Sequence, residues 1–420
     1  MSVITIFGGT FCKSEPVVKN VLSSLGYKLV TDNDLVAEAS RLSGMPANKI
    51  IKAFSAKESV FNNFTHEKEV SIAWLKLAMA EKLAGDELLV SGFTGSLIPK
   101  SISHVLRVCI IADMKFRTSH AAAEQNISEK EAVKLIHKQD EDRIAWISNL
   151  FKKNDPWDSS LYDLVIPMDK MDLEKAVSLI KDNAGKEVVK PTSRSRKAVD
   201  DFLVASKVEM RLAREGHNVG ISAKDGAVTI IINKHVLLLS KLEDELKSIA
   251  RKAPGVKAVE TKVGEGYYQT DIYRKYDFKM PSKVLLVDDE REFVQTLSER
   301  LIMRDMGSAV AYDGESALNL ISEDEPEVII LDLKMPGING IEVLRRVKQS
   351  NPDIEVIILT GHGTEADREL CMKLGAFAYL QKPVDIEVLS DTLKKANDKI
   401  RIKKSGGSAT KKQVHKNKLY

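Results

Sequence analysis

The sequence contains little cysteine and no long apolar segment. Its 420 residues include three cysteines, Cys12, Cys109 and Cys371, which lie far apart in or beside apolar runs. This spacing argues against a disulfide framework or a metal cluster and favours reduced thiols. No apolar run reaches the ~20 residues that span a bilayer, and the N-terminal MSVITIF indicates a strand rather than a signal peptide. We therefore expect a cytoplasmic protein without a transmembrane segment.

The sequence also lacks an excess of charge of one sign. Its 63 basic and 60 acidic residues leave a net charge of +3, so no whole-molecule field favours nucleic acid or an anionic membrane. Only the C-terminal tail is strongly basic, and short basic tails are usually solvated. No helix-turn-helix or zinc-ligand spacing indicates DNA binding. Hydrophobic residues make up 43% of the chain, which is typical of folded domains.

Composition divides the chain into three folded segments. Two polar stretches that contain glycine or proline interrupt the apolar patterning and are predicted to be linkers. The predicted organisation is a first domain at 1–185, a linker at 186–197, a small α+β domain at 198–264, a second linker at 265–282, a third domain at 283–403 and a basic disordered tail at 404–420.

The third segment alternates short apolar runs with amphipathic stretches such as GIEVLRRVKQ. Strands that are apolar throughout are typical of a sheet buried on both faces. Helices between such strands imply parallel pairing with right-handed crossovers. The pattern therefore predicts a flavodoxin-like, doubly wound α/β fold with a five-stranded parallel sheet.

Polar side chains close the apolar runs of this segment. The first run ends in Asp288, Asp289 and Glu290, and later runs end at Asp332, Thr360 and Lys382. Because carboxyl ends of parallel strands share one edge of a sheet, these residues are expected to converge where ligands bind. A single acidic strand end is usually only a solvated turn, but this many polar ends in this order favour a site.

Converging carboxylates repel one another, and a hard divalent cation such as Mg²⁺ relieves the repulsion. The cation would also neutralise a phosphoryl donor while Asp332 attacks phosphorus. In this interpretation Lys382 binds a phosphoryl oxygen and Thr360 donates a hydrogen bond to the acyl phosphate.

These residues resemble the response-regulator receiver family, which they match in VDDE (287–290), LDLKMPGINGIEVL (331–344), ILTGHG (358–363) and YLQKP (379–383). The resemblance implies that Asp332 is the phosphoacceptor and that Asp289, Asp332 and the Lys334 carbonyl bind the cation, assisted by Asp288. It implies a switch pair, Thr360 and Tyr379. It also implies a sensor histidine kinase or phosphotransfer protein as partner and allows a homodimer through the receiver.

The first segment begins with a strand, VITIF, a glycine-containing turn, GGTFCKS, and a helical pattern, PVVKNVLSSLG. This is the setting of a phosphate-binding loop at a helix N-terminus. If Lys13 and Ser14 take the lysine and hydroxyl places of G-x-x-x-x-G-K-[ST], Phe7 and Cys12 stand in the two glycine places. A side chain at position 12 is expected to obstruct the phosphates.

The order of the elements that follow, including ELLVSG, RVCIIA and KQDEDRIAWISNLF, resembles the cytidylate-kinase-like branch of the nucleoside monophosphate kinases over nearly all of 1–185. The resemblance implies a P-loop-kinase-like α/β domain with ATP or another nucleotide as ligand. The matching nucleotide-binding candidates are Gly8, Gly9, Lys13, Ser14, Arg117 and Arg143, the last in a D-x-x-R pattern. Alternatively, the three basic residues are ordinary surface charges. Cys12, and Phe93 where the family often has arginine, favour a binding or scaffold role over an enzyme.

The middle segment is predicted to fold as helix, strand, strand, helix and strand. Asp225-Gly226, followed by AVTI and later by Pro254-Gly255-Val256, resembles a BON domain, a small module usually linked to membrane or ligand binding. His217 and His235 stand alone here and are assigned no role.

These patterns together predict a phosphorelay response regulator that accepts a phosphoryl group on Asp332 and signals through its kinase-like and middle domains. One alternative is a nucleoside monophosphate kinase gated by receiver phosphorylation. Another is an interaction module that is never phosphorylated.

Overall fold

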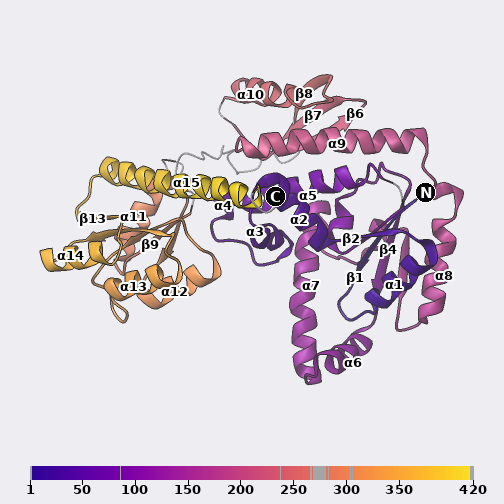
Figure 1. Cartoon of the computed structure of the whole chain (residues 1–420), viewed down its shortest axis with the longest axis horizontal. Helices are drawn as coiled ribbons and strands as arrows, with labels where there is room; N and C mark the ends of the chain where they lie inside the picture. The colour runs from indigo at the N-terminus through magenta and orange to yellow at the C-terminus, as the bar shows by residue number, and fades with distance from the viewer. Residues whose placement is uncertain are drawn as a thin grey trace. The chain divides into compact units, whose positions relative to one another are not determined.

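The computed structural model divides into two compact units (Figure 1). The first comprises Met1–Glu58 and Glu67–Arg274, and the second comprises Ser59–His66 and Lys275–Tyr420. The structure describes residues 2–85, 87–236, 238–264, 267, 281, 283–302, 304 and 306–416, without the side chains of 63, 64 and 404–416. The predicted second linker lies largely outside the described residues.

The first unit opens with a parallel five-stranded sheet in the order β2-β3-β1-β4-β5. The strands are β1 (Val3–Gly8), β2 (Lys28–Thr31), β3 (Leu88–Ser91), β4 (Val105–Ile111) and β5 (Leu164–Pro167). Successive side chains of β1 point to opposite faces, so Val3 and Phe7 join one core and Ile4 and Ile6 join the other. Both faces of the sheet are buried, as the predicted α/β fold requires.

Helices cover both faces of this sheet (Figure 1). They are α1 (Ser14–Leu25), α2 (Asp32–Ser43), α3 (Ala47–Ile51), α5 (Glu67–Lys82), α6 (Met114–Gln125), α7 (Glu129–Phe151) and α8 (Leu173–Ala184). The connections include short 3₁₀ turns, η1 (Lys52–Phe54), η2 (Phe93–Leu97), η3 (Ser159–Leu161) and η4 (Glu187–Val189). A capping box starts α7, where Ser128 and Glu131 satisfy each other's backbone N–H groups.

The middle segment follows the predicted order of elements. These are α9 (Ser193–Arg214), β6 (Gly220–Lys224), β7 (Ala227–Ile232), α10 (Leu239–Arg251) and β8 (Ala258–Val263). Strand β7 is central, with β6 antiparallel and β8 parallel to it.

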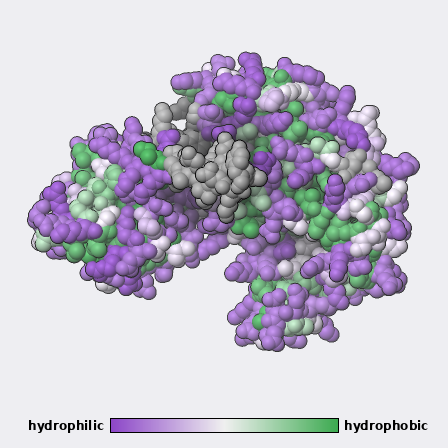
Figure 2. Space-filling view, viewed as in Figure 1, coloured by the Kyte–Doolittle hydropathy of each residue, from purple (hydrophilic) through white to green (hydrophobic). Residues whose placement is uncertain are grey.

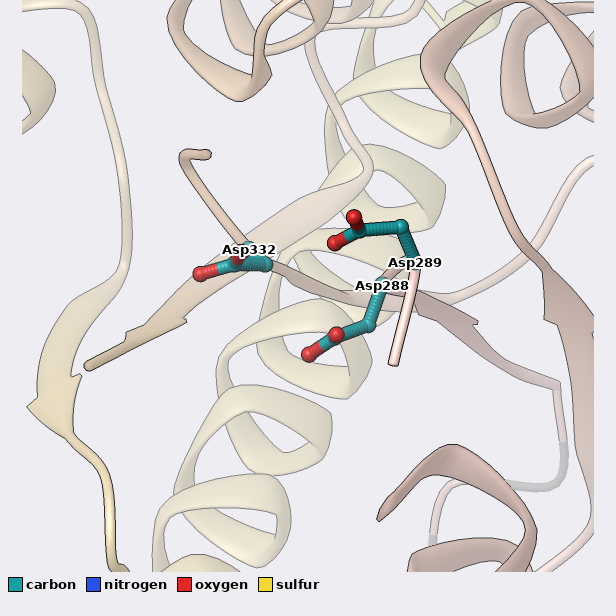
Figure 3. Close-up of side chains that lie close together, drawn as sticks. All are labelled: Asp288, Asp289 and Asp332. Carbon is teal, nitrogen blue, oxygen red and sulfur yellow. The ribbon is translucent and has the colours of Figure 1, made fainter. Parts of the chain in front are cut away.

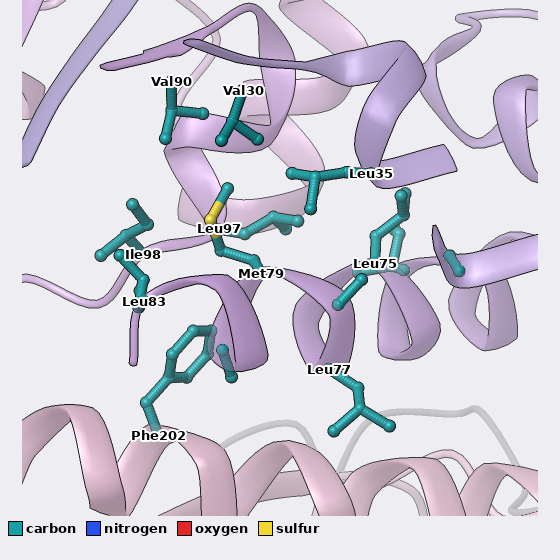
Figure 4. Close-up of a cluster of buried hydrophobic side chains, with 14 of the residues drawn as sticks. Val30, Leu35, Leu75, Leu77, Met79, Leu83, Val90, Leu97, Ile98 and Phe202 are labelled. Carbon is teal, nitrogen blue, oxygen red and sulfur yellow. The ribbon is translucent and has the colours of Figure 1, made fainter. Parts of the chain in front are cut away.

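Helix α9 begins earlier than the composition predicts. Residues 193–197 were expected to be linker, but Thr192 and Ser195 form a capping box that starts the helix there. Side chains of this helix are buried in two different cores. Phe202 is buried against the α5 side of the first core (Figure 4), whereas Val208 and Leu212 belong to the core of the middle sheet. Regular structure therefore extends further toward the first domain than predicted.

The second unit contains a parallel five-stranded sheet in the order β10-β9-β11-β12-β13. Its strands are β9 (Val284–Val287), β10 (Ser308–Ala311), β11 (Val328–Leu331), β12 (Glu355–Thr360) and β13 (Ala378–Gln381). Its helices are α11 (Arg291–Ile302), α12 (Gly314–Glu323), α13 (Gly340–Ser350), α14 (Glu365–Lys373) and α15 (Ile386–Lys416). Numbered within the unit, the order is 2-1-3-4-5, which is the flavodoxin-like order and confirms the predicted fold.

The last helix, α15, continues through most of the tail that was predicted to be irregular. Adding residues to an existing helix costs far less than nucleating a new one. Near its middle, α15 is held to the sheet by Glu355, which is fully buried and lies 2.9 Å from the Lys399 ammonium.

Residues 59–66 belong to the same unit, and α4 (Asn62–Thr65) lies among them. The Ser59 hydroxyl donates to the Asp324 carboxylate at 2.6 Å, and the buried Phe61 ring lies 5.8 Å from the Lys283 ammonium.

Hydrophilic side chains dominate the face drawn in Figure 2, and apolar ones form scattered patches between them. Within the described ranges, no helix is both long enough and apolar enough to cross a bilayer.

Candidate functional site

Three carboxylates meet at the carboxyl edge of the second sheet (Figure 3). Asp288 and Asp289 follow β9, and Asp332 follows β11. These two strands are paired in register, with Val287 opposite Leu331, so the residues that follow them become neighbours. One carboxylate oxygen from each aspartate lies within 4.8 Å of the others. Asp288 and Asp332 are buried, and Asp289 is exposed, so the site has an open side.

The charge on this cluster is only partly compensated. Burial raises the pKa of Asp288, although the Lys382 ammonium lies 2.7 Å from its carboxylate. The Oδ1 atom of Asp332 is buried and has no hydrogen-bond partner among the described residues. A buried carboxylate oxygen without a partner is costly. The carboxylate oxygens of the three aspartates together form a donor set that suits a hard divalent cation.

Two more predicted site residues close neighbouring strands. Thr360 ends β12 with its side chain buried, and its hydroxyl accepts a hydrogen bond from the His362 backbone at 3.4 Å. Lys382 follows β13 and contacts Asp288 and Glu290, at 2.7 and 2.9 Å. Burial alone would lower the pKa of Lys382, but these two carboxylates outweigh it and raise the pKa. The structure thus brings the lysine and the threonine to the acidic edge.

Tyr379 on β13 points toward the loop that follows Thr360. Its hydroxyl is buried without a partner among the described residues, and burial raises its pKa. A side chain at Gly363 would collide with this hydroxyl, and one at Gly340 would collide with the Asp332 carbonyl. Gly340 is therefore required by its close approach to backbone, whereas a side chain at Gly363 would displace the Tyr379 ring. Lys334 is exposed in the loop after Asp332.

The predicted phosphate loop joins β1 to α1 in the first unit. Gly8 ends β1, and Ser14 begins α1. Between them, Phe11 and Lys13 adopt left-handed backbone conformations, with φ of 58° and 57°. The Ser14 hydroxyl is buried without a partner among the described residues, and a side chain at Gly8 would collide with it. The exposed Lys13 places its ammonium 5.4 Å from the Phe116 ring.

Both predicted arginines reach this loop. Arg117, which is 5% exposed, binds Asp140 through two contacts of 2.7 and 2.8 Å and donates from Nε to the Thr10 carbonyl at 2.9 Å. Arg143 donates from Nε to the Gly8 carbonyl at 2.8 Å, and burial lowers its pKa. These two arginines are therefore not ordinary surface charges. Gly9 lies beside Arg117, because a side chain at Gly9 would contact both Cys12 and Arg117.

The structure also shows features that the sequence reasoning missed. Phe7 packs against Phe93 at 5.9 Å between ring centroids, and Phe93 packs against Phe54 at 5.2 Å. The rings thus form an aromatic core at the loop, although nothing in their sequence spacing marked them as neighbours. Asp32 was also missed. It caps η2 by accepting from the backbone N–H groups of Phe93 and Thr94, each at 2.9 Å.

The sheet order and the residues at its carboxyl edge define a receiver-type α/β domain. The chain belongs to the response regulator receiver family through residues 284–394, which match the model described as response regulator receiver domain. Sporulation initiation phosphotransferase F of Bacillus subtilis is 34% identical over 116 residues, which cover 28% of this chain and 94% of that protein.

Other relatives match over the same region. The transcriptional regulatory protein CpxR of Escherichia coli K12 is 45% identical over 102 residues, covering 24% of this chain and 43% of CpxR. The chain thus spans less than half the length of the first curated relatives that it matches. A solved receiver domain from Clostridium thermocellum is 35% identical and covers 29% of this chain and 97% of its own, with a TM-score of 0.28.

The first segment has a family match of its own. Residues 3–170 match the model described as cytidylate kinase-like family, as the order of its elements predicted. Neither family match reaches residues 198–264, so the resemblance of that segment to a BON domain stays a prediction.

Proposed function

We propose that the chain is a cytoplasmic response regulator of a two-component phosphorelay that accepts a phosphoryl group on Asp332. The observation that carries this proposal is the unpartnered, buried Asp332 oxygen, which lies among two further carboxylates on an edge shared with Lys382 and Thr360. The family match supports the same conclusion.

The donor would be a phosphohistidine on a sensor histidine kinase or a phosphotransfer protein. An Asp332 carboxylate oxygen attacks phosphorus, so that a P–O bond forms while the donor's N–P bond breaks and its imidazole keeps the electron pair. Lys382 binds a phosphoryl oxygen, and the Thr360 hydroxyl donates to another. Mg²⁺, held by Asp288, Asp289, Asp332 and the Lys334 carbonyl, would neutralise charge on the transferred group.

The signal would leave the site through Thr360 and Tyr379. A hydrogen bond from Thr360 to the acyl phosphate draws its hydroxyl inward, and the Tyr379 ring moves into the space that is vacated. The unpartnered Tyr379 hydroxyl favours such a movement, because the ring gives up no hydrogen bond in leaving its position. The altered face would act on the kinase-like and middle domains or form a receiver homodimer.

Phosphoryl transfer to purified full-length protein tests the proposal. With acetyl phosphate and Mg²⁺, intact mass should show one phosphoryl group on the wild type and none on Asp332→Asn. Asp353→Asn is the matched control, because Asp353 is an exposed carboxylate outside the acidic cluster, and it should be labelled like the wild type. An unlabelled wild type, or a label that persists in Asp332→Asn, would contradict the assignment.

A second candidate function is a nucleoside monophosphate kinase gated by receiver phosphorylation. The convergence of Arg117, Arg143 and the buried Ser14 hydroxyl on the loop favours nucleotide binding. Against turnover, Arg117 is already satisfied by Asp140 and Thr10. We therefore place a binding or scaffold role first.

Turnover of ATP with CMP and Mg²⁺, before and after acetyl phosphate treatment, separates these two functions. A gated kinase would turn over nucleotide at a rate that changes on phosphorylation, and the change would be absent in Asp332→Asn. Absence of binding and of turnover in a protein still phosphorylated on Asp332 would identify the first domain as a kinase-derived scaffold.

A further inference from the structure

The Lys382 ammonium is enclosed by three groups of the receiver. It lies 2.7 Å from the Asp288 carboxylate, 2.9 Å from the Glu290 carboxylate and 4.4 Å from the centroid of the Phe293 ring. An ammonium has three N–H donors, and two carboxylates and a ring face are enough to engage them. Within the described part of the chain, no ion pair joins Lys382 to Asp332. A phosphoryl group on Asp332 must therefore compete with a group that the lysine already contacts.

Of the three groups, Glu290 is the one that can move aside at low cost. Its side chain is 67% exposed, so water can solvate the carboxylate once it leaves the lysine. The Asp288 side chain is buried, and separating it from Lys382 would leave a buried charge unpaired. The Phe293 ring is packed against the core of the receiver. An exposed ion pair contributes only about two- to fivefold to an equilibrium, so the Glu290 contact can exchange.

The backbone of Glu290 is fixed, although its side chain is exposed. Its N–H donates to Asp288 Oδ1 at 3.0 Å, and its carbonyl accepts from the Val294 N–H at 3.0 Å at the start of α11. The contact with Lys382 therefore depends on the length of the side chain. An aspartate at this position, which is one methylene group shorter, would end about 1.5 Å further from the lysine.

We propose that Glu290 is a positioning residue that competes with the phosphoryl group on Asp332 for the Lys382 ammonium. This inference rests on the proposed phosphorylation of Asp332. Before phosphorylation, the lysine bridges Asp288 and Glu290. In the phosphorylated receiver, Lys382 keeps its contact with Asp288 and exchanges Glu290 for a phosphoryl oxygen, while the glutamate carboxylate moves into water. The competition weakens the hold of the site on the phosphoryl group.

Calorimetric titration of full-length protein with beryllofluoride, a tetrahedral analogue of a phosphoryl group, measures this competition at saturating Mg²⁺. Glu290→Gln removes the charge, whereas Glu290→Asp keeps the charge and shortens the side chain. Both variants should bind beryllofluoride about two- to fivefold more tightly than the wild type, because both weaken the contact with Lys382.

Glu292→Gln is the matched control. It removes an exposed carboxylate in the first turn of α11 and leaves the pair of Glu290 and Lys382 intact. At about 0.15 M salt, which screens exposed charges, it should bind beryllofluoride like the wild type. Titration with Mg²⁺ alone should give the wild-type affinity for Glu290→Asp, since Glu290 lies outside the cluster of three aspartates. A distorted site would change that affinity.

Unchanged or weaker beryllofluoride binding by both Glu290 variants would overturn the proposal. Tighter binding by Glu290→Gln but not by Glu290→Asp, or equally tight binding by Glu292→Gln, would also overturn it, because net charge rather than contact with Lys382 would then be the cause. So would an altered Mg²⁺ affinity of Glu290→Asp. A wild type that binds no beryllofluoride with Mg²⁺ would contradict the phosphorylation of Asp332 itself, and this inference with it.

Discussion

At the scale of single residues, the acidic edge keeps Asp332 in an unfavourable environment. Its buried oxygen lacks a partner, and its charge contributes to the raised pKa of Asp288, after the larger effect of burial. Function and stability therefore oppose each other at this position, as is common in sites that bind a cation or a phosphoryl group.

Asp332→Asn should stabilise the metal-free receiver, because an amide removes like-charge repulsion from the cluster. We expect the free energy of unfolding to rise by about 1 kcal/mol, measured by urea denaturation in EDTA. Added Mg²⁺ should stabilise the wild type but not the variant. Asp353→Asn should have the stability of the wild type in EDTA and should be stabilised by Mg²⁺ as the wild type is. A variant less stable than the wild type in EDTA would contradict this account of the site.

The three cysteines lie in environments that suppress their reactivity. All are buried. Burial is the main cause that raises the pKa of Cys12 and of Cys371 to about 11 and that of Cys109 to about 12. Because the thiolate is the nucleophile, raising the pKa lowers the reactive fraction at any pH below it.

Native protein at pH 8 should therefore resist iodoacetamide at Cys12, where only on the order of one thiol in a thousand is ionised. The labelling rate should rise with pH toward 11. Peptide mass spectrometry measures it, and protein unfolded in urea, in which all three thiols should react, is the control. Rapid labelling of Cys12 in folded protein would show that the loop opens more often than its packing implies.

At the scale of elements, α9 packs against two sheets that the sequence analysis assigned to separate domains. Phe202 is 7% exposed, and its ring lies against the cluster that contains Leu83 and Met79 (Figure 4). The same helix supplies Val208 and Leu212 to the middle core. The helix is therefore a structural part of both domains.

Phe202→Ala should cost about 3 kcal/mol of unfolding free energy, because a buried ring is replaced by a cavity. Urea denaturation followed by circular dichroism measures the loss, and Asp200→Ala, at an exposed position of the same helix, should leave stability nearly unchanged. Equal effects of the two substitutions would mean that the packing of α9 on the first core contributes little.

At the scale of the whole molecule, the chain forms two compact units, each with a core on both faces of its own parallel sheet. Domains with separate cores often unfold in separate steps, which violates two-state behaviour. A ligand that binds only one unit then stabilises only the step in which that unit unfolds.

We expect calorimetry of the full chain to show two transitions, of which Mg²⁺ raises only one. The responsive transition should be that of the second unit, since it carries the Asp288, Asp289 and Asp332 cluster. In Asp332→Asn, the response to Mg²⁺ should be lost while both transitions remain. A single transition, or two transitions that Mg²⁺ raises by the same amount, would show that the units unfold together.

The fold and the acidic edge of the receiver could be predicted from the sequence. Its strands are apolar throughout, which specifies a buried parallel sheet, and parallel pairing carries the carboxyl ends of β9 and β11 to one edge. The sequence thus predicts that Asp288 and Asp332 lie on one edge, whereas the direct pairing of β9 with β11, which makes them neighbours, is a feature of the tertiary structure. The start of α9 could not be predicted by composition, because the local capping box of Thr192 and Ser195 decides it.

Only the tertiary structure decided how the first domain uses its side chains. The pairing of Arg117 with Asp140 and the packing of Phe7 on Phe93 join residues from separate elements. Chain order does not specify such contacts, because they depend on the directions in which packed helices and strands present their side chains. The sequence by itself determined the receiver fold and the residues at its edge, because the apolar runs and the polar residues that end them can be identified locally along the chain.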